Sequence, residues 1–149
     1  MKTRILALTG ALVLIAAFPA VAGTNKFSKS LKGGGTVSFK VKTNKKGTAT
    51  KLTSINVNSL PAKCTTVDTV TDQVVSASLG KVKVTKQSLG GSTTYQFNLQ
   101  KTVAGRRWQF RGAFSSRKGR KVSEGFVGVG YLDGALDCSG GTTFKAKRK

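Results

Sequence analysis

The arginines and lysines between positions 106 and 121 are the residues whose types and spacing could do chemistry. Seven cations stand in these 16 positions, and Glu124 is the nearest acid along the chain. Guanidinium groups bind carboxylates and phosphates through paired hydrogen bonds, and lysine adds a compact positive charge. Such a cluster attracts polyanions. The predicted binding residues are Arg106, Arg107, Arg111, Arg117, Lys118, Arg120 and Lys121.

The composition of the whole chain points the same way. Its 149 residues carry 26 Lys and Arg against 5 Asp and Glu, a formal net charge of +21. A second interpretation is that the charge only keeps a sheet protein soluble and protects its edge strands from aggregation. Mixed charges would serve that purpose equally well, so the strong excess of one sign favours contact with a polyanion.

Catalytic chemistry finds little support in the sequence. The chain has no histidine, which excludes a Ser-His-Asp triad, a Cys-His pair and a histidine metal site. The carboxylate pairs Asp68/Asp72 and Asp133/Asp137 are typical of turn residues, and no calcium-binding loop is recognisable. We predict a non-enzymatic protein without metal or cofactor; an enzyme that uses Asp133 and Asp137 is the alternative.

Two motifs match better-known sites in composition only. Ser115-Ser-Arg-Lys118 fits the S-x-x-K nucleophile pattern, but it falls in a predicted turn. The glycines between 125 and 134 precede no helix, so they do not form a phosphate-binding loop.

Trp108 and Phe110 lie among arginines, as in nucleic-acid stacking platforms, but their alternation places them inside the core. A nucleic-acid partner is therefore not expected.

The first 22 residues read as a secretory signal peptide. Lys2 and Arg4 precede an apolar stretch from Ile5 to Ala17, and Ala20-Val21-Ala22 forms a small-x-small cleavage site. The prediction is a helical signal peptide over 1–22 and a single exported domain over 23–149, with no later membrane segment. Removing Lys2 and Arg4 from the 26 basic residues leaves 24 against 5 acids, a net charge of +19.

The two cysteines are expected to form a structural disulfide. Exported thiols normally pair, and Cys64 and Cys138 allow a single intramolecular bridge. A catalytic thiol would need a histidine or a CxxC partner, which this sequence lacks.

The body of the chain has the period of β-strands. Apolar and polar residues alternate in several short runs, for example over 37–41, 95–99 and 127–131. Glycine-containing turns separate the runs, and we place turns at 79–80 and 139–141 among others. This pattern predicts an all-β antiparallel sandwich of about seven to nine strands, with barrel-like closure possible. Pro61 is expected to end a strand, so that Cys64 follows that strand and Cys138 precedes the last one.

The predicted core is made of the side chains that share one parity along these runs. It consists of Val37, Phe39, Val41, Ile55, Val57, Val82, Val84, Tyr95, Phe97, Leu99, Trp108, Phe110, Val127, Val129 and Phe144.

Several segments resemble a loosely defined group of small exported bacterial β-sandwich domains of uncharacterised function. They are GTVSFKV at 35–41, NSLPAKC ending at Cys64, WQFRGAFSSRKGRKVSEGFV at 108–127, and TTFKAKRK after Cys138. The resemblance implies a sandwich and an export route, and it carries over no active site.

The leading hypothesis is therefore an extracytoplasmic cationic domain that associates with an anionic envelope polymer or polysaccharide. The alternative is a structural or adhesive domain that binds a protein through a sheet edge or an end loop. That alternative predicts an exposed apolar patch and binding that survives high salt.

Overall fold

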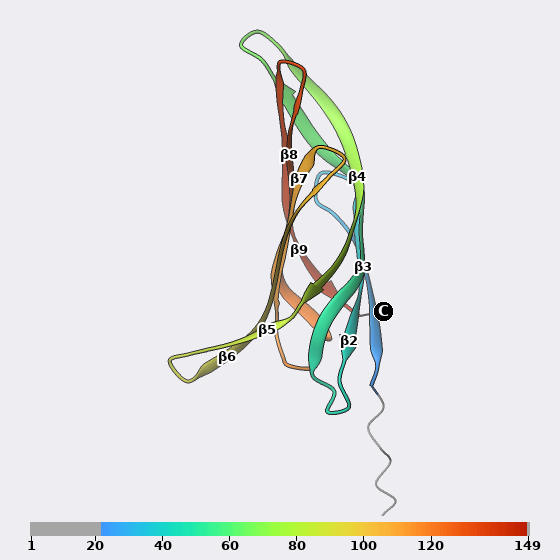
Figure 1. Ribbon diagram of the computed structural model, residues 1–149, viewed down its shortest axis with the longest axis vertical. Helices are drawn as coiled ribbons and strands as arrows, with labels where there is room; N and C mark the ends of the chain where they lie inside the picture. The colour runs from blue at the N-terminus through green and yellow to red at the C-terminus, as the bar shows by residue number, and fades with distance from the viewer. Residues whose placement is uncertain (1–21, 149) are drawn as a thin grey trace, which may run out of the picture.

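The protein is built from nine β-strands, as seen in a computed structural model that describes residues 22–148 (Figure 1). Within this range every regular element is a strand. The predicted signal peptide lies outside the described residues except for Ala22. The strands are β1 (Thr24–Ser30), β2 (Thr36–Thr43), β3 (Ala49–Thr65), β4 (Val70–Lys83), β5 (Thr85–Leu89), β6 (Ser92–Val103), β7 (Arg106–Phe114), β8 (Lys121–Asp133) and β9 (Leu136–Lys147).

All strand pairs are antiparallel and belong to one sheet. The order is β1-β2-β3-β9-β8-β7-β6-β5, and β4 pairs with β3. Strand β3 holds β4 along one edge, while β2 and β9 share its other edge, β2 up to Asn58 and β9 from Lys63. The all-β antiparallel prediction and the number of strands are confirmed. The sheet does not close into a barrel, which the sequence had left open.

The core lies where the first strands of the sheet face the last ones. Phe39 of β2 has ring-centroid distances of 6.4 Å to Phe97 of β6, 5.6 Å to Phe110 of β7 and 6.4 Å to Phe144 of β9. Trp108 and Phe110 are buried, as their alternation predicted. Most of the predicted core is confirmed; four members are half-buried and pack against it, namely Val82, Val84, Tyr95 and Leu99.

The disulfide is present, but its place in the fold differs from the prediction. Cys64 and Cys138 lie inside β3 and β9 and are directly opposite each other in the register. The bridge therefore joins two paired strands, and the expectation that Cys64 follows a strand and Cys138 precedes the last one is wrong. Pro61 does not end β3. It lies between Asn58 and Lys63, where the edge of β3 that β2 and β9 share has no partner strand, so the missing N–H of proline is tolerated there.

Two of the predicted turns are also wrong. Gly80 lies within β4 at a register shift opposite Ile55, with φ of 86°, which marks a bulge. The glycines at 140 and 141 lie inside β9. Position 140 requires glycine because a side chain there would collide with the Pro61 carbonyl oxygen of the neighbouring β3. The turn between β8 and β9 is instead made at Gly134, with φ of 61°.

Candidate polyanion-binding surface

The structure divides the predicted cationic cluster into three parts. Arg106 opens β7 on the core-facing side, with its guanidinium 4.8 Å from the ring centroid of Tyr131. Arg107 and Arg111 are exposed on the outer face of the same strand. The other four cations follow beyond Phe114, around the β7–β8 turn. Strand β7 spans about 27 Å between its ends at about 3.4 Å per residue, so Arg106 lies far from that turn.

The β7–β8 turn is held rigidly against the rest of the sheet. The backbone N–H of Ala49 donates to the Arg117 carbonyl oxygen at 2.7 Å, and that of Arg148 donates to the Arg120 oxygen at 3.0 Å. Gly119 is buried with φ of 57°, and an added Cβ there would lie 2.7 Å from the Cβ of Ala49. The cations of this turn are therefore displayed from a fixed backbone.

Three segments bring their positive charges to this end of the molecule. The β2–β3 turn ends just before Ala49, and β9 ends beside β8, where Lys147 pairs with Lys121. Figure 1 shows the β2–β3 and β7–β8 turns together at the lower end. We call this exposed set the basic end; it comprises Lys45, Lys46, Arg117, Lys118, Arg120, Lys121, Lys147 and Arg148.

A row of lysines crosses the neighbouring strands near the basic end. Lys42 of β2 lies opposite Lys51 of β3, and Lys51 lies opposite Lys83 of β4. All three are exposed. Like charges directly opposite each other destabilise a sheet. Sequence reasoning missed this row, because strand pairing over such distances leaves no local signal.

The acidic residues gather at the opposite end. Asp68 lies in the β3–β4 turn, Asp72 of β4 pairs with Lys63, Asp133 ends β8, and Asp137 of β9 pairs with Thr65. Figure 1 shows the β3–β4 and β8–β9 turns together at the upper end. Four of the five carboxylates of the chain therefore lie away from the basic end.

The carboxylates do not converge into the pair that the enzymatic alternative requires. Asp137 lies opposite Leu132, whereas Asp133 lies opposite Leu136, so the two aspartates face opposite sides of the β8–β9 hairpin. Asp133 accepts a hydrogen bond of 3.1 Å from the Gln73 amide. Within residues 22–148 no group of three or more His, Cys, Asp or Glu side chains could hold a metal ion. The same residues contain no helix long and apolar enough to cross a membrane.

Comparisons with known proteins leave the chain without an assigned family. No protein-family model matches it, and no match was found among curated proteins or solved structures. The resemblance to small exported bacterial domains therefore stays a prediction.

Proposed function

We propose that this protein is an exported, non-enzymatic cationic sheet domain that associates electrostatically with an anionic polymer of the cell envelope or its surroundings. The observation that carries the proposal is the separation of charge: eight cations from three segments form the basic end, and four of the five carboxylates lie at the other end. A field with this polarity gives the molecule a preferred side toward a polyanion.

The energetics of the bare surface support the same conclusion. The paired lysines Lys121 and Lys147, like the row at Lys42, Lys51 and Lys83, place like charges on directly opposite positions. Such pairs cost stability unless counterions or a bound anion neutralise them. A charge arrangement needed only for solubility would avoid this cost by mixing signs.

Export rests on the signal-peptide pattern of residues 1–22 and is supported by the disulfide. A buried bridge between Cys64 and Cys138 suits an oxidising compartment. Association would then take place outside the cytoplasm.

The test compares two variants that lose the same charge from different places. The first carries glutamine at Arg117, Lys118, Arg120 and Lys121; the control carries glutamine at four exposed lysines away from the basic end, Lys29, Lys32, Lys63 and Lys101. Retention on an immobilised anionic polysaccharide at low salt should fall much further for the first variant. Equal retention of the two would show that position does not matter and would remove the basic end as the binding surface.

A second candidate function is supported by apolar side chains at the acidic end. Val67, Val70, Val74 and Leu132 are 65–100% exposed. Leu132, Asp137, Thr65 and Val70 occupy successive paired positions across β8, β9, β3 and β4, so Leu132 and Val70 share one face. This surface suits a protein partner with apolar and basic side chains. Binding of such a partner should survive high salt and be lost in the Val70→Ser, Leu132→Ser double variant.

A further inference from the structure

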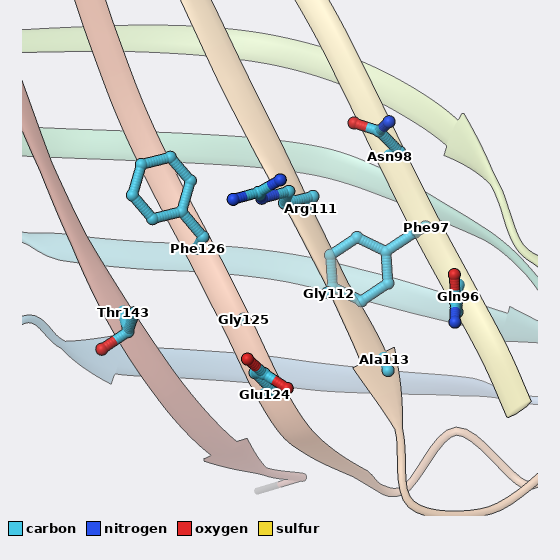
Figure 2. Close-up of a pocket in the computed structure, with 10 residues that line it drawn as sticks. All are labelled: Gln96, Phe97, Asn98, Arg111, Gly112, Ala113, Glu124, Gly125, Phe126 and Thr143. Atoms are coloured by element: carbon cyan, nitrogen blue, oxygen red, sulfur yellow. The ribbon is translucent and has the colours of Figure 1, made fainter.

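The outer face of β6–β9 carries two hollows between the charged ends. One, of about 500 Å³, is lined by Gln96 and Asn98 of β6, Arg111 of β7, Glu124 and Phe126 of β8, and Thr143 of β9 (Figure 2). A second, of about 290 Å³, begins on the other side of Phe126 and is lined by Gln100, Arg107, Gln109, Gly128 and Gly140. We call the two hollows together the outer groove.

Phe126 lies between the hollows, and its ring packs against glycines of β8 and β9. A Cβ added to Gly128 would lie 2.8 Å from the Phe126 ring, and one added to Gly141 would lie 3.0 Å from it. The ring therefore packs directly on the backbone of β8 and β9. Phe126 is only half-buried, so part of its apolar surface faces solvent. The glycines of this segment thus serve close packing, as expected for glycine within strands.

Polar side chains line the same hollow as this ring and have unused hydrogen-bonding capacity. The Arg111 guanidinium lies 5.2 Å from the Phe126 ring centroid, and Figure 2 shows it pointing toward the ring. Within residues 22–148, the side chains of Arg111, Asn98 and Glu124 have no hydrogen bond to another protein group. The groove therefore offers a cation beside the apolar ring, an amide two strands away on β6, and a carboxylate two residues along β8.

This combination fits a sugar ring that carries a carboxylate. The C–H face of a pyranose is apolar and packs on an aromatic ring, while its hydroxyls both donate and accept hydrogen bonds. Asn98 can do both, Glu124 accepts, and Arg111 binds a carboxylate through two parallel bonds. The groove is open, and its two hollows follow one another along the sheet, which suits a polymer chain better than a small enclosed ligand.

Single-stranded nucleic acid fits less well. Recognition of that kind uses successive aromatic rings on which neighbouring bases stack. The outer groove has one partly exposed ring, Phe126; Trp108, which also borders the second hollow, is buried.

We propose that the outer groove binds the uronic-acid units of a carboxylated polysaccharide, with Phe126 against the sugar ring and Arg111 on the carboxylate. This inference rests on the proposed function, because it names the class of anionic polymer that the basic end attracts. The basic end supplies attraction that any polyanion satisfies, and the outer groove supplies selection for sugar.

The experiment measures affinity for four polymers at low salt and at about 1 M salt. At the higher concentration the Debye length is about 3 Å, so attraction between exposed charges is largely screened. The polymers are polygalacturonate, polyphosphate, neutral dextran and single-stranded DNA. The variants are Phe126→Ala, Asn98→Ala, the fourfold glutamine variant of the basic end, and Gln87→Ala as a control at an exposed position of β5. Asn98→Ala keeps the test valid if loss of Phe126 disturbs folding, because Asn98 is exposed.

At high salt the wild type should keep measurable affinity for polygalacturonate and lose its affinity for polyphosphate. Phe126→Ala and Asn98→Ala should each lower that high-salt affinity, by about tenfold for Phe126→Ala. The inference is overturned if both variants match Gln87→Ala, if high-salt binding of polygalacturonate is absent, or if dextran or DNA binds as well there. Failure of the proposed function looks different: the basic-end variant would keep low-salt binding of polyphosphate.

Discussion

At the scale of single residues, alternation along β7 decides what each arginine of the predicted cluster contacts. Arg106 and Arg107 are neighbours in the sequence, yet Arg106 lies over Tyr131 on the core side and Arg107 is exposed on the outer face. The alternation of Trp108 and Phe110 already predicted which side of β7 is buried. The contact with Tyr131 could not be predicted, because it depends on the pairing of β7 with β8.

Glycine packing gives a prediction at the same scale. A Cβ at Gly125 would lie 2.5 Å from the Phe144 ring, whereas at Gly130, on the opposite face of β8, the nearest atom would be 3.9 Å away. Gly125→Ala should therefore lower the free energy of unfolding by about 1–3 kcal/mol through overpacking. Gly130→Ala should change it by less than about 0.5 kcal/mol. Denaturant unfolding measures both, and equal effects would contradict the packing described for Phe144.

At the scale of elements, the number and antiparallel pairing of the strands follow from alternation and turn residues. What the sequence could not show is where two strands meet far along the chain. Pro61 and the glycines at 140 and 141 are typical of strand ends and turns, but they lie inside β3 and β9. These two strands approach each other so closely at this point that position 140 has no room for a side chain. The same approach places Cys64 opposite Cys138. Long-range pairing thus overrode local turn preference.

The disulfide gives a prediction for this junction. It joins cysteines of β3 and β9 that are 74 positions apart in the sequence. Replacing both cysteines by alanine should lower the free energy of unfolding by about 2–5 kcal/mol, because the unfolded chain regains the freedom that the bridge removes. A reductant should lower the unfolding midpoint of the wild type and leave that of the double variant unchanged. A wild-type midpoint that does not respond to reduction would contradict a stabilising role.

The lysine row across β2, β3 and β4 gives a second prediction for elements. Lys51 faces Lys42 on one side and Lys83 on the other, so Lys51→Thr removes two repulsive pairs. It should raise the free energy of unfolding at low salt by about 0.2–1 kcal/mol, and the gain should shrink as salt screens the charges. Lys86→Thr is the matched control, because Lys86 pairs with Tyr95. Indistinguishable melting curves for the two variants would mean that the row carries no repulsion.

At the scale of the whole molecule, turns gather most of the acidic side chains at one end and a dense group of basic side chains at the other. The pairs Asp68/Asp72 and Asp133/Asp137 are far apart in the sequence, but the β3–β4 and β8–β9 turns bring them to one end. The basic end likewise combines the β2–β3 turn, the β7–β8 turn and the end of β9. The sequence predicted the charge excess and the cations around the β7–β8 turn. It could not predict this polarity, because topology alone decides which turns share an end.

The central claim is that the basic end binds polyanions by charge, and a salt titration of binding to polyphosphate tests it most directly. The logarithm of the wild-type association constant should fall linearly with the logarithm of salt concentration, as expected when bound cations release counterions. The slope should become clearly shallower when Arg117, Lys118, Arg120 and Lys121 are replaced by glutamine. The claim is contradicted if wild-type binding is independent of salt, or if the fourfold variant keeps the wild-type slope and affinity.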